Sequence, residues 1–180
     1  MNIKIGKYII GKNRPCFIVA EMSGNHNKSL SRAIKIIKAA KRAGANAIKL
    51  QTYKADTITL NSKKKDFAIG KSSPWSKSKT MWNLYKNAST PWKWHRKLFD
   101  VAKKNKLLIF SSPFDESAVD FLEKLNCPAY KIASPEINHF PLLKKVAKTK
   151  KPIILSSGLS NFKDLRMAVK FLRKNGVKKI

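Results

Sequence analysis

The sequence predicts an α/β fold in which parallel strands alternate with helices, as in part of a TIM (β/α)8-type barrel. Five short apolar runs alternate with segments of helical spacing, and most of these units recur every ~20 to 30 residues, as barrel units do. Each run ends in small polar or charged residues, and the runs span residues 16–21, 47–51, 107–112, 129–134 and 152–158. Because ligands of parallel α/β folds bind at the carboxyl ends of the strands, we expect the functional site at this edge.

The remaining elements follow from local signals. Alternating residues with glycines over 3–11 predict a β-hairpin before the first strand. The first helix is expected to begin after Ser29, which can cap it, and to stop near Gly44. Later helices are expected to begin after residues that can cap a helix or that favour its first turn, namely Thr90-Pro91, Asp115 and Asn161.

The connection over residues 53–89 is polar and rich in Lys, Ser and Thr, with Trp75, Trp82 and Tyr85 set into it. A connection of this length is typical of an active-site lid or a binding loop. Two roles stay open for its aromatic side chains, which are local packing and a platform that binds a sugar.

Five units are followed by residues 177–180, which look like the start of a sixth strand. A complete barrel of this type takes about 250 residues in eight units. We therefore expect residues 1–180 to be the N-terminal part of a longer protein, with a truncated and inactive product as the alternative.

The charge of the chain is extreme, because 39 Lys and Arg face ten Asp and Glu, giving +29. Such a charge favours a polyanionic partner. However, only six of the basic residues are Arg, the side chain that reads bases and phosphates bidentately. The lysines are also spread over nearly every expected helix and loop. We expect solvated lysine surfaces with salt-sensitive, nonspecific attachment and no specific nucleic-acid partner, while a functional polyanion surface stays the alternative.

No apolar run approaches the ~18 to 20 residues of a membrane span, and the first residues lack the features of a secretory signal. A cytoplasmic protein without a membrane partner is therefore expected. Cys16 and Cys127 lie in or beside apolar runs, and we expect both to be buried, reduced thiols.

Four ionisable residues occupy expected strands or strand ends. Glu21 and Glu136 are the only acidic residues at strand tips, where they could act as general acid or base or pair with a nearby lysine. Lys49 and Lys131 each interrupt an apolar strand, and a buried ammonium requires an anionic partner. Three roles stay open for these lysines: each could bind a phosphate or carboxylate, form a Schiff base, or simply reach solvent. The first interpretation requires both ammonium groups to enter one cavity from adjacent strand ends and to bind one small dianion.

Ser112, Ser134 and Ser156 end three successive expected strands, where hydroxyls and helix N-termini favour a phosphate site. The three histidines have no metal-ligand spacing. For Asn25 and His26, helix capping or hydrogen bonding to a substrate is preferred to metal binding.

The chain resembles the sialic-acid synthase (N-acetylneuraminate synthase) family, and within it the pseudaminic acid synthase branch. The matching phrases occur in the family's order and cover residues 17–26, 47–53, 90–95, 110–115, 128–134 and 151–158. The resemblance implies that phosphoenolpyruvate condenses with the open-chain aldehyde of an N-acetylated amino sugar. The product would be a nonulosonic acid, and phosphate would leave by C–O cleavage.

By the same resemblance, the catalytic residues are Glu21, Lys49 and Lys131. Phosphoenolpyruvate would be held by five residues, which are Lys49, Ser112, Lys131, Ser134 and Ser156. The sugar would be contacted by three, which are Asn25, Gln51 and Glu136. Glu21 would orient or activate water.

The resemblance also implies a divalent metal ion, Mn2+ or Mg2+, whose histidine ligands come from later barrel strands, so that none is expected in this chain. It further implies a homodimer in which a C-terminal antifreeze-like domain reaches into the partner's site. The later strands and this domain are absent from the 180 residues, so we expect no activity from the chain alone.

Overall fold

The computed structural model describes residues 2–180. Five parallel strands form one curved sheet in the order β3-β4-β5-β6-β7, which is about half of a barrel and confirms the predicted fold class. The strands are β3 (Val19–Glu21), β4 (Ala47–Thr52), β5 (Leu108–Pro113), β6 (Tyr130–Ile132) and β7 (Ile153–Leu155). The helices are α1 (Leu30–Arg42), α2 (Met81–Ala88), α3 (Trp92–Lys104), α4 (Glu116–Glu123), α5 (Phe140–Lys148) and α6 (Phe162–Lys174).

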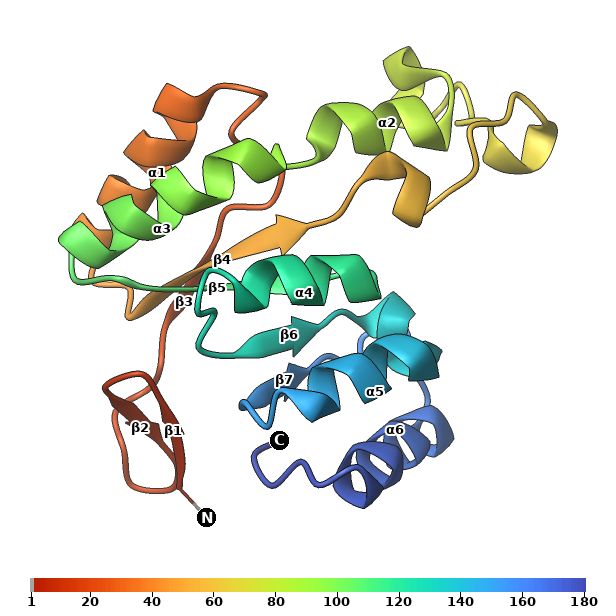
Figure 1. The fold of residues 1–180 in the computed structure, drawn as a ribbon. Coiled ribbons are helices and arrows are strands. Elements are labelled where there is room, and N and C mark those ends of the chain that lie inside the picture. The colour runs from red at the N-terminus through yellow and green to blue at the C-terminus, as the bar shows by residue number, and fades with distance from the viewer. Residues whose placement is uncertain (1) are drawn as a thin grey trace.

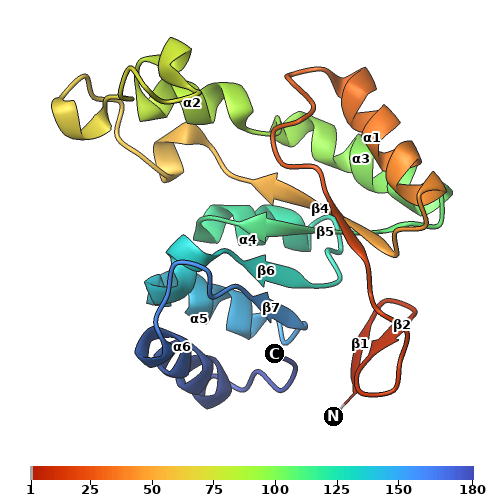
Figure 2. The same ribbon diagram turned by 180° about the vertical axis from the view of Figure 1, so that it is seen from behind.

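The helices pack on one face of the sheet. In Figure 1, α4 and α5 lie in front of the strands. In Figure 2, seen from behind, β5, β6 and β7 lie in front of these helices, and no helix covers the three strands on that side. The core therefore lies between the sheet and the helices. Its fully buried side chains include Ile37, Ile48, Leu50, Leu98, Leu122, Tyr130, Ile132, Leu142 and Leu172.

Strands β1 (Ile3–Ile5) and β2 (Tyr8–Ile10) form the predicted antiparallel hairpin. Its turn includes Gly6 at φ +56°, a conformation that favours glycine. A Cβ atom at Gly6 would lie 2.7 Å from Leu108 Cδ1, so the hairpin packs closely against the start of β5. It thus lies at the amino end of the sheet, opposite the edge where the strands end (Figure 1).

Most helix starts agree with the sequence. Ser29, Asp115 and Asn161 each accept a hydrogen bond from the backbone N–H three residues later. Thr90 is the exception, because α3 begins after Pro91 without a side-chain cap. The Thr90 hydroxyl is instead buried against His26 Nε2, at 3.1 Å.

Three further details differ from the prediction. Only residues 19–21 of the first apolar run form a strand. Residues 177–180 form no strand, although Ile153 N–H donates to the Lys179 carbonyl at 2.9 Å beside β7. Cys127 is buried as expected, whereas Cys16 is exposed because it precedes the sheet; both thiols are free.

The connection over residues 53–89 folds into α2 and three short 3-10 helices, η1 (Ala55–Thr57), η2 (Lys65–Phe67) and η3 (Ser76–Ser78). A fourth, η4 (Ser134–Asn138), follows β6. No helix within residues 2–180 is both long and apolar enough to cross a membrane.

Candidate functional site

Strand register brings four of the predicted site residues to the face of the sheet that the helices leave open. Lys49 pairs with Phe110, and two residues further along both strands Gln51 pairs with Ser112. Ser111 pairs with Tyr130, so Ser112 and the next residue of β6, Lys131, share the same face. Lys49, Gln51, Ser112 and Lys131 therefore all project from the face opposite the helices.

Glu21 lies beside Lys49 in the β3–β4 pairing, and the two side chains form an ion pair. The other carboxylate oxygen, Oε1, accepts a hydrogen bond from Ser23 N–H at 3.3 Å. The pairing of Glu21 with a neighbouring lysine, one of the two interpretations of the sequence, is thus present. The side chain of Lys49 is 10% exposed and that of Glu21 is 46% exposed, so the carboxylate keeps access to solvent.

The two lysines are not on adjacent strands, because β5 lies between β4 and β6. They nevertheless interact electrostatically. Burial lowers the pKa of Lys131, and the positive charge of Lys49 lowers it further, while Glu21 and Glu136 act in the opposite direction. Two ammonium groups and two carboxyl groups thus gather above the open face near the carboxyl ends of the strands, and the two lysines are the groups there that can bind a small anion.

Glu136 lies in η4, directly beyond β6, and is half-buried. Burial raises the pKa of its carboxyl group, and the charge of Lys131 opposes this shift. Among the described residues, the buried atoms Glu136 Oε2 and Ser112 Oγ have no hydrogen-bond partner. Asp115 Oδ2 and Ser160 Oγ are unpartnered as well. Buried polar atoms are nearly always paired, so each of these atoms is a candidate contact for water or a ligand.

The other two serines also lie at strand ends. Ser134 is the first residue of η4, and a Cβ atom at Gly158 would lie 3.8 Å from its Oγ atom. Ser156 directly follows β7, and its N–H donates to the Ile132 carbonyl at 3.1 Å. Ser112, Ser134 and Ser156 thus occupy the ends of β5, β6 and β7, the edge at which the sequence predicts an anion site.

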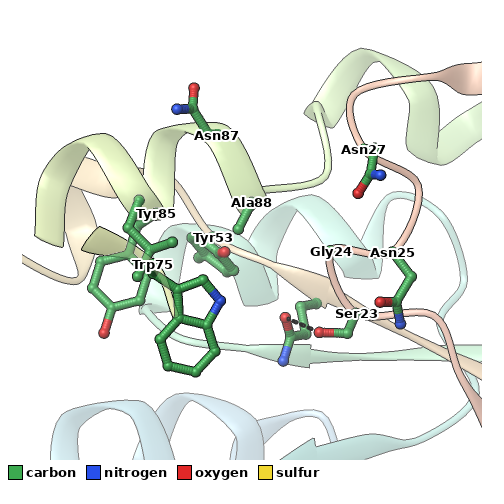
Figure 3. A pocket seen from close by; sticks show the side chains of 11 residues that line it. Ser23, Gly24, Asn25, Asn27, Tyr53, Trp75, Tyr85, Asn87 and Ala88 are labelled. Atoms are coloured by element: carbon green, nitrogen blue, oxygen red, sulfur yellow. Dashed lines mark hydrogen bonds between the residues drawn. The ribbon is translucent and has the colours of Figure 1, made fainter. Parts of the chain in front are cut away.

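A cavity of about 630 Å³ adjoins this edge, beyond Gln51. Its floor includes a hydrogen bond from Ser23 Oγ to Gln51 Oε1 at 3.3 Å. Figure 3 shows the aromatic side chains of Tyr53, Trp75 and Tyr85 on one side and the loop of Ser23 and Asn25 on the other. Two of the predicted sugar-binding residues, Asn25 and Gln51, line this cavity, whereas Glu136 does not.

The two walls of the cavity are tied to each other. Lys28 Nζ donates to the Ser89 carbonyl at 2.6 Å, which joins the loop after β3 to the residue that ends α2. Gly24 lies so near α2 that a Cβ atom there would be 3.1 Å from the Ala88 carbonyl oxygen. The cavity therefore depends on close approach of two segments that are far apart in the sequence.

The aromatic residues of the long connection divide between the two roles that the sequence left open. Trp82 packs locally, since its Nε1–H donates to Asp56 Oδ1 at 2.7 Å. Trp75 and Tyr85 line the cavity, and Tyr85 packs edge-on against Tyr53 with ring centroids 6.1 Å apart.

Two histidines are used inside the protein instead of at the site. His26 is fully buried, and this burial lowers its pKa. Its Nδ1 atom accepts a hydrogen bond from Lys28 N–H, and its Nε2–H donates to the Thr90 hydroxyl. His95 Nε2 lies 2.9 Å from Thr52 Oγ1, and burial lowers the pKa of His95 to about 4. Residues 2–180 contain no group of three or more His, Cys, Asp or Glu side chains placed to hold a metal ion, so they do not fit a metal site by themselves.

Sequence reasoning missed Ser23 and Tyr53 as lining residues. Tyr53 directly follows β4 and stands two residues beyond Gln51, so the two-residue period of an extended strand could have identified it. Ser23 lies in the turn after β3 with φ +46°, where that period does not hold, and no sequence signal identifies it.

Comparison with known proteins gives consistent matches. The model of the NeuB family matches residues 36–180. The chain is 48% identical over 161 residues to a pseudaminic acid synthase of Helicobacter pylori. This alignment covers 89% of this chain and 47% of that protein. It is 46% identical over 163 residues to a pseudaminic acid synthase of Campylobacter jejuni, covering 91% of this chain and 46% of that one.

The structure is similar to the crystal structure of N-acetylneuraminic acid synthetase from Leptospira borgpetersenii in complex with citrate. The TM-score is 0.83 at 31% identity, and the match covers 97% of this chain and 56% of the other. The chain spans about half the length of the curated relatives that it matches.

Proposed function

The chain belongs to the NeuB family, and from this premise we propose that it carries the phosphoenolpyruvate site of a nonulosonic acid synthase. Carbon 3 of phosphoenolpyruvate attacks the aldehyde carbon of an open-chain N-acetylated amino sugar, and a C–C bond forms. Water adds at C2, and the tetrahedral intermediate expels phosphate by C–O cleavage. The products are a nonulosonic acid, pseudaminate or a related sialic acid, and inorganic phosphate.

In this proposal Lys49 and Lys131 bind the carboxylate and phosphate of phosphoenolpyruvate. The hydroxyls of Ser112, Ser134 and Ser156 complete the anion site. The observation that carries the proposal is the position of both lysines on the open face, where the charge of Lys49 lowers the pKa of Lys131. Charge-assisted hydrogen bonds from fixed donors bind an anion and stabilise charge that develops during the reaction.

Glu21 orients or activates the water that adds at C2, and its partly exposed carboxylate is compatible with this role. In the free protein Lys49 neutralises it, and a bound anion would compete for that ammonium group. Asn25, Gln51 and Glu136 contact the sugar. The unpartnered oxygen of Glu136 supports such a contact, since a sugar hydroxyl can supply the missing donor.

A divalent ion, Mn2+ or Mg2+, belongs to the proposal for the complete protein, where it would polarise the aldehyde. Because residues 2–180 hold no suitable ligand group, no step above uses it. The proposal also includes a homodimer, as the family resemblance implies.

The test is a phosphate-release assay on the complete gene product, supplied with phosphoenolpyruvate, Mn2+ and N-acetylated amino sugars. Phosphoenolpyruvate labelled with 18O at the bridging oxygen reports which bond breaks. We expect the label in phosphate, as C–O cleavage requires. No phosphate release with any of the sugars contradicts the proposed function, and label retained in the keto acid contradicts the proposed bond cleavage.

A further inference from the structure

Three buried polar side chains form a hydrogen-bonded network on the helix face of the sheet, behind the proposed anion site. Thr52 Oγ1 lies 2.9 Å from His95 Nε2 and 2.7 Å from Ser111 Oγ. All three residues are fully buried. The network therefore joins the last residues of β4 and β5 to α3, the helix that carries His95.

The direction of each bond in this network follows from its acceptors. The Pro91 carbonyl can only accept, so His95 Nδ1, which lies 3.3 Å from it, carries the ring hydrogen. Burial lowers the pKa of His95 to about 4, so at neutral pH the imidazole is neutral and its Nε2 atom is an acceptor. Thr52 therefore donates to Nε2 and accepts from the Ser111 hydroxyl. One arrangement of hydrogens satisfies the whole network.

The residues next to this network in the sequence face the proposed anion site. Side chains alternate along a strand, so Gln51 and Ser112 project from the face opposite to that of Thr52 and Ser111. Ser112 Oγ is buried and has no hydrogen-bond partner among the described residues. No such bond fixes this hydroxyl from the open side, so its position depends on the backbone that Ser111 anchors from behind.

Filling the helix face would not require this polar chemistry. Apolar side chains of the same shape can replace a pair of hydrogen-bonded groups with little change in stability. What the polar network adds is direction, because hydrogen bonds weaken steeply when their angles change. A fully satisfied buried network thus specifies one geometry for the strand ends that it joins.

Resting on the proposed function, we propose that His95 is a positioning residue, which holds Ser112 in the anion site through the hydroxyls of Thr52 and Ser111. The network acts from behind the sheet and touches no substrate. Its effect is to set the end of β5 relative to the end of β4, so that the Ser112 hydroxyl meets the anion that Lys49 binds from the neighbouring strand.

The first test compares two substitutions of Thr52 in the complete gene product. Thr52→Val keeps the shape of the side chain but leaves His95 Nε2 without a donor and Ser111 without its acceptor. We expect it to weaken phosphoenolpyruvate binding about tenfold in isothermal titration, as for one misaligned hydrogen bond to a charged group. Thr52→Ser keeps the hydroxyl and should bind nearly as the wild type does. Wild-type affinity in Thr52→Val, or an equal loss in both variants, overturns the inference.

Thr90→Val is the matched control, because it breaks the other buried bond between a threonine and a histidine. Thr90 is fully buried with its Oγ1 atom 3.1 Å from His26 Nε2, and this bond joins the start of α3 to the loop after β3 instead of to β4 or β5. We expect Thr90→Val and Thr52→Val to lower the urea midpoint similarly, and only Thr52→Val to weaken binding. Weaker binding in both would assign the effect to lost stability and overturn the inference.

The last test needs no ligand and separates the inference from the proposed function. In 15N NMR, His95 should carry its hydrogen on Nδ1 and none on Nε2. Amide exchange at residues 111 and 112 should be faster in Thr52→Val than in the wild type, Thr52→Ser or Thr90→Val. A hydrogen on Nε2, or unchanged exchange in Thr52→Val, overturns the inference. A wild-type protein that binds no phosphoenolpyruvate contradicts the proposed function, and this measurement still decides whether the network holds Ser112.

Discussion

At the scale of single residues, burial and neighbouring charge shift the pKa values of two groups that bear on function and stability. Lys131 is half-buried and faces Lys49, and both effects favour its neutral form. His95 is buried among Thr52, Pro91 and Phe121, which favours the neutral imidazole. The lysine lies at the proposed anion site and the histidine behind the sheet, so the two residues yield separate predictions.

The charge of Lys131 should matter for phosphoenolpyruvate binding. We expect Lys131→Met to weaken binding roughly 10- to 100-fold, the range for losing a hydrogen bond to a charged group. Isothermal titration of the complete protein with phosphoenolpyruvate measures the change. Lys97→Met, which removes an exposed lysine of α3, is the control and should bind as the wild type does. Unchanged binding in Lys131→Met would remove this lysine from the site.

The pH dependence of binding follows from the same residue. Because the pKa of Lys131 is lowered, its ammonium group loses its proton at a lower pH than an ordinary lysine. Affinity for phosphoenolpyruvate should fall as the pH rises through this pKa. In Lys131→Arg the side chain stays protonated, so the fall should move to higher pH. Identical pH profiles for the two proteins would contradict the prediction.

His95 should make stability depend on acid. Its pKa is lowered from 6.5 to about 4 in the folded protein, so between these values the unfolded chain binds a proton that the folded chain does not. Stability is therefore retained above pH 6.5 and lost as the pH falls toward 4, by roughly 3 kcal/mol for this group. Urea unfolding at a series of pH values measures the loss. His95→Gln should be less stable at neutral pH but should lose less on acidification.

At the scale of elements, short caps and one long connection organise the edge that carries the site. Asn161 and Asp164 form a reciprocal capping box at the start of α6, with the Asp164 N–H donating to Asn161 Oδ1 at 2.9 Å. Thr80 caps α2 with a single bond, in which its Oγ1 accepts from Asn83 N–H at 3.3 Å, within the connection that the sequence predicts to be a lid or binding loop. Met81, Leu84, Tyr85 and Ala88 recur at helical spacing, so this short pattern of eight residues is the signal by which α2 could have been predicted.

The α6 cap supplies a stability prediction. We expect Asn161→Ala to lower the free energy of unfolding by about 1 kcal/mol, because it leaves an N-terminal N–H of the helix without its acceptor. Urea denaturation gives the value. Lys163→Ala, an exposed change in the first turn of the same helix, should have almost no effect. A similar loss in both variants would mean that the cap contributes nothing specific.

At the scale of the whole molecule, the charge of +29 is spread over helices and loops instead of forming the site. Only three ion pairs form within residues 2–180, and two of them, Lys145–Asp120 and Lys151–Glu123, lie away from the carboxyl edge of the sheet. Most lysines therefore face solvent without an acidic partner among the described residues, and polyanions should attach through general electrostatics.

Nucleic-acid binding should accordingly be indiscriminate. We expect filter binding of DNA fragments with unrelated sequences to give equal affinities, with the logarithm of the affinity falling linearly and steeply with the logarithm of salt concentration. A marked preference for one sequence or structure would favour a functional polyanion surface over solvated lysine faces.

Much of the architecture could be predicted because its signals are local. Apolar runs and capping residues identified all five strands of the parallel sheet and most helix starts, and the residues that end the strands are the ones at the proposed site. Thr90 shows the limit of local reasoning, since a residue with good capping chemistry bonds instead to His26, 64 positions away.

The sequence by itself determined the alternation of strands and helices and the set of polar residues at the strand ends, because both depend on neighbours along the chain. The tertiary structure alone decided that Glu21 pairs with Lys49 and that β5 separates the two lysines while all three strands share an open face. It also decided that Trp75 and Asn25 line the same cavity from opposite sides. These contacts depend on strand register and on how residues 53–89 fold back, and both are set by packing between segments that are distant in sequence.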